Sequence, residues 1–327
     1  MKLFGHDSAI EAFRSALDGG KLHHAWLLAG PKGVGKAMFA DLAAQRVLAQ
    51  AAAPDGLGEG LSVSDTHPTA QLIRAGSHPD LRKLVRLPRD RKPDELARNI
   101  TVDQVRGIQS LFATTPSMSD WRAVVIDAID DLERPAANAL LKNLEEPPPN
   151  CVFLIVCHSP GRILPTIRSR CRMLKFSRLS DDVMASAIAQ AEPNLDADER
   201  AALVRIGNGA PGQALQYAGL DIADLDTAIA TLIEQGDTGN GARAALAQSL
   251  ALKKAQPRYE AFLDRAPTAI AAHARTLEGK ALENALCAWE EARSLAGGAQ
   301  RLSLDPQATV FTLAGLLASL HEPRHDA

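Results

Sequence analysis

The chain has 327 residues, with 36 Lys and Arg against 39 Asp and Glu and a formal net charge of −3. Its pI near 6.3 excludes a protein that binds nucleic acid mainly through bulk positive charge, so any DNA contact must come from a local patch or from partners. Hydrophobic residues at 46% are enough for hydrophobic cores and argue against disorder. The length suggests about two to three domains of ~100–200 residues each.

Cysteine usage and hydropathy predict the compartment of the protein. The four cysteines contain no CxxC pair, so they indicate neither a disulfide framework nor a zinc site. The longest strongly apolar stretch is Cys151–Cys157, far short of the roughly 18–20 residues that a membrane span needs. The N-terminus lacks the apolar region of a signal peptide. We therefore expect a reduced, cytoplasmic protein that does not enter a membrane.

The first 178 residues alternate short apolar runs with helical patterns. Strands are expected where short apolar runs are flanked by Gly, Pro or Asp: at 24–30, 81–87, 121–127, 151–157 and 172–176. Helices are expected between them, at 36–49, 101–113, 135–146 and 162–168. Thr101 and Gln104 have the spacing of a capping box at a helix start. This alternation predicts an α/β fold with a parallel sheet and right-handed crossovers.

From residue 180 onward the strand pattern disappears, and the sequence becomes rich in alanine, which favours helix over strand. Ser180-Asp181-Asp182 is typical of a helix N-terminus. Glycine-rich segments at 207–212 and 236–241 are expected as a turn and a linker between helices. We therefore expect an α/β domain over 1–178, with 50–76 as a surface insertion, a helical lid over 179–222 and an all-α domain over 223–327.

A glycine-rich segment follows the first expected strand and precedes the first long helix. It is the phosphate-loop pattern in the context that confirms it, and it reads Gly30-Pro31-Lys32-Gly33-Val34-Gly35-Lys36. Its glycines let backbone N–H groups converge on phosphate oxygens, and the following helix adds its dipole. The ammonium of Lys36 would reach the β- and γ-phosphates. These seven residues, with Asp127 at the end of a later strand, are the candidate nucleotide-binding residues.

Two parts that ATP hydrolysis needs are missing from this pattern. The position after Lys36 should carry a hydroxyl that ligates Mg²⁺, but it is Ala37. The strand that ends at Asp127 should continue with Glu, but Ala128 follows. Metal binding and water positioning carry most of the catalysis of phosphoryl transfer. The sequence therefore favours a relic loop or a nucleotide site without hydrolysis over a competent ATPase, and binding of ATP or ADP stays open.

Five further segments converge on one family. They read HHAWLL at 23–28, GSHPD at 76–80, ITVDQVR at 100–106, AANALLKNLEEPP at 136–148 and HSPGRILPTIRSRC at 158–171. Together they resemble bacterial sliding-clamp-loader subunits of the AAA+ class, most closely the delta-prime family of DNA polymerase III subunits. The motifs cover about residues 4–215, and the last two segments are specific to clamp loaders.

The resemblance implies a RecA-like AAA+ domain, a helical lid and a helical collar that joins subunits into an open ring. In such rings ATP lies between subunits, and the arginine of a Ser-Arg-Cys motif points at the γ-phosphate held by the neighbour. Here the motif is Ser169-Arg170-Cys171, so Arg170 is the expected arginine finger in trans, with Arg168 as the competing residue. A guanidinium is always charged and offers a rigid fork of donors. A surface ion pair would also explain a lone arginine at this position.

The departures from the family pattern favour a non-motor subunit. The motor subunits, gamma and tau, carry the hydroxyl and the Asp-Glu pair that Ala37 and Ala128 replace. Gln213 stands in the lid where motors place an arginine that senses the γ-phosphate. Many relatives hold zinc with four cysteines in the insertion after the first helix, but residues 50–76 contain none. Scattered N and O donors without thiolates are a poor structural zinc set, namely His67, His78 and Asp80. We therefore expect no zinc and no required cofactor.

The function that follows is a largely non-hydrolysing stator of the DNA polymerase III clamp loader. The implied partners are the gamma/tau and delta subunits and, through the complex, the sliding clamp and primer–template DNA. Such a chain belongs to a nucleotidyltransferase complex without having an ATPase of its own. Two alternatives are a motor-like AAA+ ATPase with its own nucleotide site and a nucleotide-sensing adaptor outside replication. Residues 82–98 are rich in Arg and Lys but lack interleaved aromatics, so we expect a solvated loop and strand edge there.

Overall fold

The computed structural model describes residues 2–89, 92–299, 302 and 304–321. The chain divides into two compact units, of which the first is Met1–Ala187 together with Gly207–Gln213. The second unit is Ile188–Ile206 together with Ala214–Ala327. The end of the expected all-α domain, residues 322–327, lies outside the described residues. The domain boundaries expected at residues 178 and 222 stay predictions.

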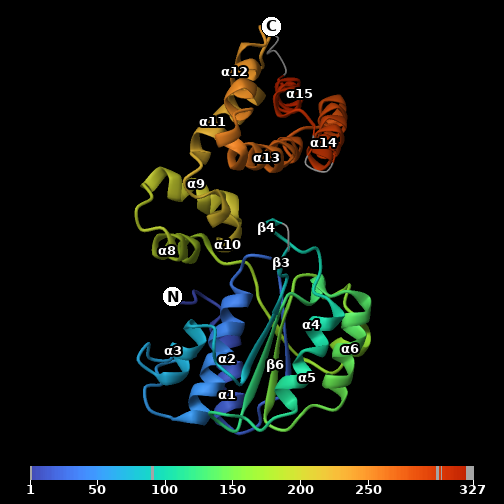
Figure 1. The fold of residues 1–327 in the computed structure, drawn as a ribbon. Helices are drawn as coiled ribbons and strands as arrows, with labels where there is room; N and C mark the ends of the chain where they lie inside the picture. Colours follow the sequence, from blue (N-terminus) through green and yellow to red (C-terminus); the bar gives the residue numbers. More distant parts are fainter. Residues whose placement is uncertain (1, 90–91, 300–301, 303, 322–327) are drawn as a thin grey trace. The chain divides into compact units, whose positions relative to one another are not determined.

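A parallel sheet of five strands forms the centre of the first unit (Figure 1). Its strands are β1 (Ala25–Ala29), β2 (Leu81–Val85), β5 (Arg122–Asp127), β6 (Cys151–Cys157) and β7 (Arg172–Lys175). Their order in space is β2-β5-β6-β1-β7, and all neighbours pair in parallel. Every residue of β1 and β6 is buried, as expected for strands covered on both faces. The five predicted strands and the α/β class are confirmed.

Helices cover both faces of this sheet (Figure 1). One face carries α1 (Asp7–Asp18) and α2 (Lys36–Ala52), with α3 (Pro68–Arg74) beside α2, and the other carries α4 (Val102–Arg106), α5 (Ile108–Phe112) and α6 (Arg134–Glu145). Successive side chains of β1 point to opposite faces. Trp26 and Leu28 therefore join the core under α1 and α2, whereas Leu27 joins the core under α4, α5 and α6.

The capping box predicted at residue 101 is confirmed. Thr101 Oγ1 accepts a hydrogen bond from the backbone N–H of Gln104, whose side chain accepts one from the backbone N–H of Thr101. The single helix expected over 101–113 is wrong in one respect, because α4 and α5 are separate short helices with Gly107 between them. Glycine has a low helix propensity, which accounts for the break.

Several elements were not anticipated from the sequence. The region 82–98 contains an antiparallel hairpin of β3 (Pro88–Arg89) and β4 (Lys92–Leu96), rather than only a loop and a strand edge. Asp90 and Arg91, which are part of that basic region, lie outside the described residues. Helices α1 and α3 were not among the predicted helices. Short elements complete the unit: the 3-10 turn η1 (Ile129–Asp131) and α7 (Pro165–Arg168).

The chain is helical from residue 181 onward, and residues 181–187 and 207–213 of this part belong to the first unit. The helices from residue 181 onward are α8 (Asp181–Ala191), α9 (Ala197–Gly207), α10 (Pro211–Ala214), α11 (Ile222–Gln235), α12 (Gly241–Leu250), α13 (Gln256–Ala274), α14 (Gly279–Ala299) and α15 (Pro306–Ala318). The predicted helix start at Ser180 and the two glycine-rich connections are confirmed. Phe262, Ile270 and Leu313 lie in one apolar core shared by α11 to α15. None of the helices formed by described residues is long and apolar enough to span a membrane.

Candidate functional site

The phosphate loop connects the end of β1 to the start of α2, as predicted. Gly33 and Gly35 have backbone φ angles of +83° and +107°, in the region that glycine tolerates and other residues rarely adopt. A Cβ atom on Gly33 would also lie only 2.8 Å from the backbone nitrogen of Gln213. The loop is therefore covered by the 209–213 segment, and the N–H of Gly212 donates a hydrogen bond of 2.8 Å to the carbonyl of Gly33.

Lys36 binds its own loop in this structure. The residue is only 3% exposed, and its ammonium donates to the carbonyl oxygen of Gly30 at 2.6 Å and to that of Pro31. Desolvation by burial lowers the pKa of Lys36 from its ordinary 10.5 to about 8. Lys36 therefore satisfies two carbonyl groups of its own loop.

The acidic residues at and after the end of β5 make different contacts. Asp127 ends the strand, and burial raises the pKa of its carboxyl group above the ordinary value. Asp130 accepts hydrogen bonds from the backbone N–H groups of His158 and Ser159 at 2.7 and 2.8 Å. Asp131 forms an ion pair with Arg86 at 3.2 Å. Asp130 and Asp131 thus hold neighbouring segments in place.

Ala128 occupies the position after the Asp strand and is 2% exposed. Its methyl group supplies neither an acceptor nor a base for an attacking water. Ala37, in the first turn of α2, likewise supplies no hydroxyl for a hard cation. The structure therefore brings together the loop, Lys36 and Asp127, but without the two side chains that complete a hydrolytic site.

A contact from the N-terminus was missed by the sequence reasoning. The Nε2 atom of His6 lies 2.8 Å from the carbonyl oxygen of Val34, in the phosphate loop. Its ring centroid lies 4.7 Å from that of Phe176, and burial lowers the pKa of His6. A single histidine distant in sequence from the loop carries no pattern that could have predicted this contact.

The candidate arginine finger follows α7. Arg170 donates from Nη1 to the carbonyl oxygen of Thr166 at 2.9 Å, and its Nη2 lies 2.9 Å from a carboxylate oxygen of Glu145. Its side chain is 35% exposed. Arg168 is exposed and, within the part of the chain that the structure describes, its guanidinium has no hydrogen bond or ion pair. The structure thus gives the two candidates different surroundings.

The other motif residues support this segment. Ser169 donates from Oγ to the carbonyl oxygen of Thr166 at 3.1 Å. Burial raises the pKa of the Cys171 thiol to about 12. A thiol with that pKa stays protonated and is a poor nucleophile, which agrees with a packing role for Cys171.

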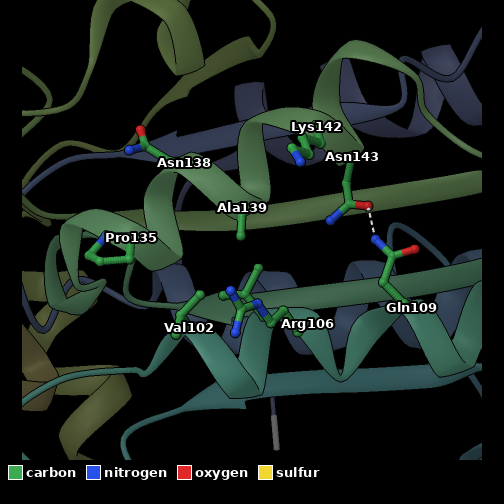
Figure 2. Close-up of a pocket in the computed structure, with 9 residues that line it drawn as sticks. Val102, Arg106, Gln109, Pro135, Asn138, Ala139, Lys142 and Asn143 are labelled. Carbon is green, nitrogen blue, oxygen red and sulfur yellow. Dashed lines mark hydrogen bonds between the residues drawn. The ribbon is translucent and has the colours of Figure 1, made fainter.

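A second concave feature lies between α6 and the α4–α5 pair and was also missed (Figure 2). Its cavity of about 400 Å³ has apolar, amide and cationic lining residues: Val102, Val105, Arg106, Gln109, Pro135, Asn138, Ala139, Lys142 and Asn143. Gln109 donates to Asn143 Oδ1 at 2.7 Å across the cavity wall. Asn143 is 6% exposed, and its Nδ2 group has no partner within the described residues.

The side chains considered for zinc bind backbone groups instead. His67 accepts a hydrogen bond at Nδ1 from the N–H of Thr69 at the start of α3. His78 accepts one from the N–H of Asp80, whose carboxylate accepts from the N–H groups of Ser117 and Met118. The described residues contain no group of three or more His, Cys, Asp or Glu side chains placed to hold a metal ion.

The insertion at 50–76 is organised around a buried arginine. Arg46 on α2 is 6% exposed and donates from Nη1 to the carbonyl oxygens of Gly58 and Ser62 at 2.8 and 3.1 Å. Leu57 and Val63 form an antiparallel bridge. One arginine therefore satisfies two carbonyl groups of the segment between α2 and α3.

Comparison with known proteins finds subunits of DNA polymerase III among the relatives of this chain. Residues 5–180 match the family model described as DNA polymerase III, delta subunit. DNA polymerase III subunit delta′ of Pseudomonas aeruginosa is 33% identical over 216 residues, which cover 65% of this chain and 62% of the relative. Subunit gamma of Buchnera aphidicola is 32% identical over 55% of this chain and 46% of its own length. Subunit tau of Bacillus subtilis is 28% identical over a stretch that covers 69% of this chain and 39% of the relative. The chain thus spans less than two thirds of the length of each of these relatives.

Proposed function

The chain belongs to the DNA polymerase III delta-subunit family, and on that membership we propose that it is the delta-prime-type stator of a clamp loader. In this role it joins the gamma/tau motor subunits and the delta subunit in the cytoplasm, and the assembly places the sliding clamp on primed DNA. The chain supplies Arg170 to the ATP held by its neighbour and does not hydrolyse ATP itself.

The observation that carries the proposal is the incomplete hydrolytic site. Ala37 and Ala128 remove the magnesium ligand and the water-orienting carboxylate, and Lys36 is bound by its own loop. Asp130 and Asp131 do not replace the missing carboxylate, because both are engaged in contacts with neighbouring segments. The relatives include both delta′ and gamma or tau subunits, so these side chains are the basis for choosing between the stator and the motor.

The chemistry and accessibility of Arg170 support the proposed trans role. Its side chain is 35% exposed, and a guanidinium keeps its charge at all physiological pH values. An arginine that enters a neighbouring site can raise phosphoryl transfer by about 10³–10⁵-fold, because it stabilises the charge of the transition state. Arg168 is the alternative donor, since it is exposed as well.

The cavity between α6 and the α4–α5 pair supports a contact with the backbone of primer–template DNA. Arg106 and Lys142 contribute two cationic side chains to its lining. Phosphate oxygens accept hydrogen bonds from such groups, and these contacts position a duplex without reading its sequence. The contact is local and therefore compatible with the acidic composition of the whole chain.

The test is the ATPase of a reconstituted clamp loader, stimulated by primed DNA and the sliding clamp. We compare wild type, Arg170→Ala, Arg168→Ala and Lys36→Ala in this subunit. The stator role predicts that Arg170→Ala lowers turnover by about ten-fold or more while the complex still assembles. Lys36→Ala should leave turnover close to the wild-type value. A damaging Lys36→Ala with a silent Arg170→Ala would refute the assignment.

Two further readouts address the alternatives. ATP turnover by the purified chain alone would favour a motor-like ATPase with its own nucleotide site. Failure to assemble with the motor subunits would favour a nucleotide-sensing adaptor outside replication.

A further inference from the structure

Arg170 is held in place by a carboxylate from a different element. Glu145 is the last residue of α6, and its Oε1 atom lies 2.9 Å from Arg170 Nη2. A second anchor comes from the carbonyl oxygen of Thr166, which accepts from Nη1. The two anchors engage different nitrogens of one guanidinium, so they fix both its position and the orientation of its plane.

The end of α6 is itself well fixed, which makes Glu145 a firm anchor. Leu144 is 1% exposed and Asn143 is 6% exposed. Asn143 also accepts the hydrogen bond from Gln109 on α5 (Figure 2). The two residues that precede Glu145 are therefore packed or hydrogen-bonded. These contacts fix the backbone that carries the Glu145 side chain.

We propose that Glu145 is a positioning residue for Arg170, an inference that rests on the proposed trans role of that arginine. Glu145 and Thr166 hold the guanidinium before the neighbouring subunit is engaged. A guanidinium has five N–H donors, so donors are left for phosphate oxygens after these contacts. Long arginine side chains lose much rotamer freedom when they become fixed. A preoriented Arg170 has already lost part of that freedom when it meets the transition state.

The adjacent residue provides a matched control. Glu146 carries the same charge one position later and is exposed. Within the described residues its side chain has no hydrogen bond or ion pair. Replacing either glutamate by alanine changes the net charge of the chain equally, so a difference between the two variants reports the contact with Arg170 rather than the charge.

The experiment uses the reconstituted clamp loader and measures kcat and KM for ATP with primed DNA and the sliding clamp. Glu145→Ala should lower kcat by about two- to five-fold, the range expected from the loss of an exposed ion pair, and leave KM and assembly unchanged. Glu146→Ala should match wild type. Glu145→Gln keeps the acceptor oxygen but loses the charge, so its kcat should lie between those of wild type and Glu145→Ala.

A double-mutant cycle identifies the route of the effect. If Glu145 acts through Arg170, Glu145→Ala should have no further effect in an Arg170→Ala background. Additive losses would overturn the proposal, as would a wild-type kcat for Glu145→Ala. An increased kcat would also overturn it, because Glu145 would then restrain Arg170 rather than orient it. A silent Arg170→Ala would instead refute the proposed function and with it this inference, so the two failures are distinguishable.

Discussion

The protonation of Lys36 provides a direct test of its burial in the phosphate loop. Its pKa is about 8 in the folded chain against an ordinary 10.5, because burial disfavours the charged ammonium. Between these two values the unfolded chain holds more protons than the folded chain. The free energy of unfolding therefore rises as pH increases through this window. Lys36→Met removes the titrating group but keeps a flexible apolar side chain.

The magnitude follows from the two pKa values. A shift of one pKa unit corresponds to 1.36 kcal/mol, and the difference in bound protons approaches one between the two values. Integrated from pH 7 to pH 9, the wild type should gain about 1.3 kcal/mol of unfolding free energy relative to Lys36→Met. Lys36 is 3% exposed, so solvent screening is small.

The assay is urea denaturation of both proteins at several pH values, evaluated as the difference between them so that other titrating groups cancel. If the difference in unfolding free energy between wild type and Lys36→Met does not change between pH 7 and pH 9, the desolvation argument is refuted. Saturating ATP provides a second arm, because a bound polyphosphate favours the charged ammonium and should flatten the slope. If ATP leaves the slope unchanged, Lys36 does not bind nucleotide.

Three other changes have clear expected outcomes. Asp130→Ala should lower the unfolding free energy by about 1–3 kcal/mol, because the backbone N–H groups of His158 and Ser159 lose a charged acceptor; calorimetry showing no loss would contradict this. Thr101→Ala should cost about 1 kcal/mol by removing the capping box, measured by urea denaturation. Lys142→Ala should reduce the slope of log K against log salt for DNA binding by the complex by about 0.9, and an unchanged slope would remove Lys142 from the DNA contact.

Strands β1 and β6 were predictable because their burial requires apolar residues at every position. β1 and β6 are buried on both faces, so each reads as an uninterrupted apolar run. The β3–β4 hairpin was missed because it lacks such a run. Pro88 and Arg89 are both exposed, and Lys92–Leu96 contains charged residues and a proline. Hydrophobic periodicity is the main indicator of strands, and the sequence of this hairpin contains no such pattern.

Within the candidate site, too, some features could be predicted from the sequence and others could not. The phosphate loop and the Ser-Arg-Cys motif are contiguous, so their residues could be named from the sequence. The contacts around them join residues that are far apart in the sequence: His6 with Val34, Gln109 with Asn143 and Glu145 with Arg170. These are polar pairs between different elements, and neither residue spacing nor hydropathy encodes which polar side chains meet after folding.

The retained loop in a chain without a complete hydrolytic site has a structural explanation. Hydrolysis depends on single side chains, and Ala37 and Ala128 do not supply them. The glycines and Lys36 also serve the fold, because Gly33 allows the close approach of the 209–213 segment and Lys36 satisfies two loop carbonyls. Loss of these residues would strain or unpair the backbone even in a protein that never binds ATP. A phosphate-loop motif therefore indicates the fold more firmly than it indicates the activity.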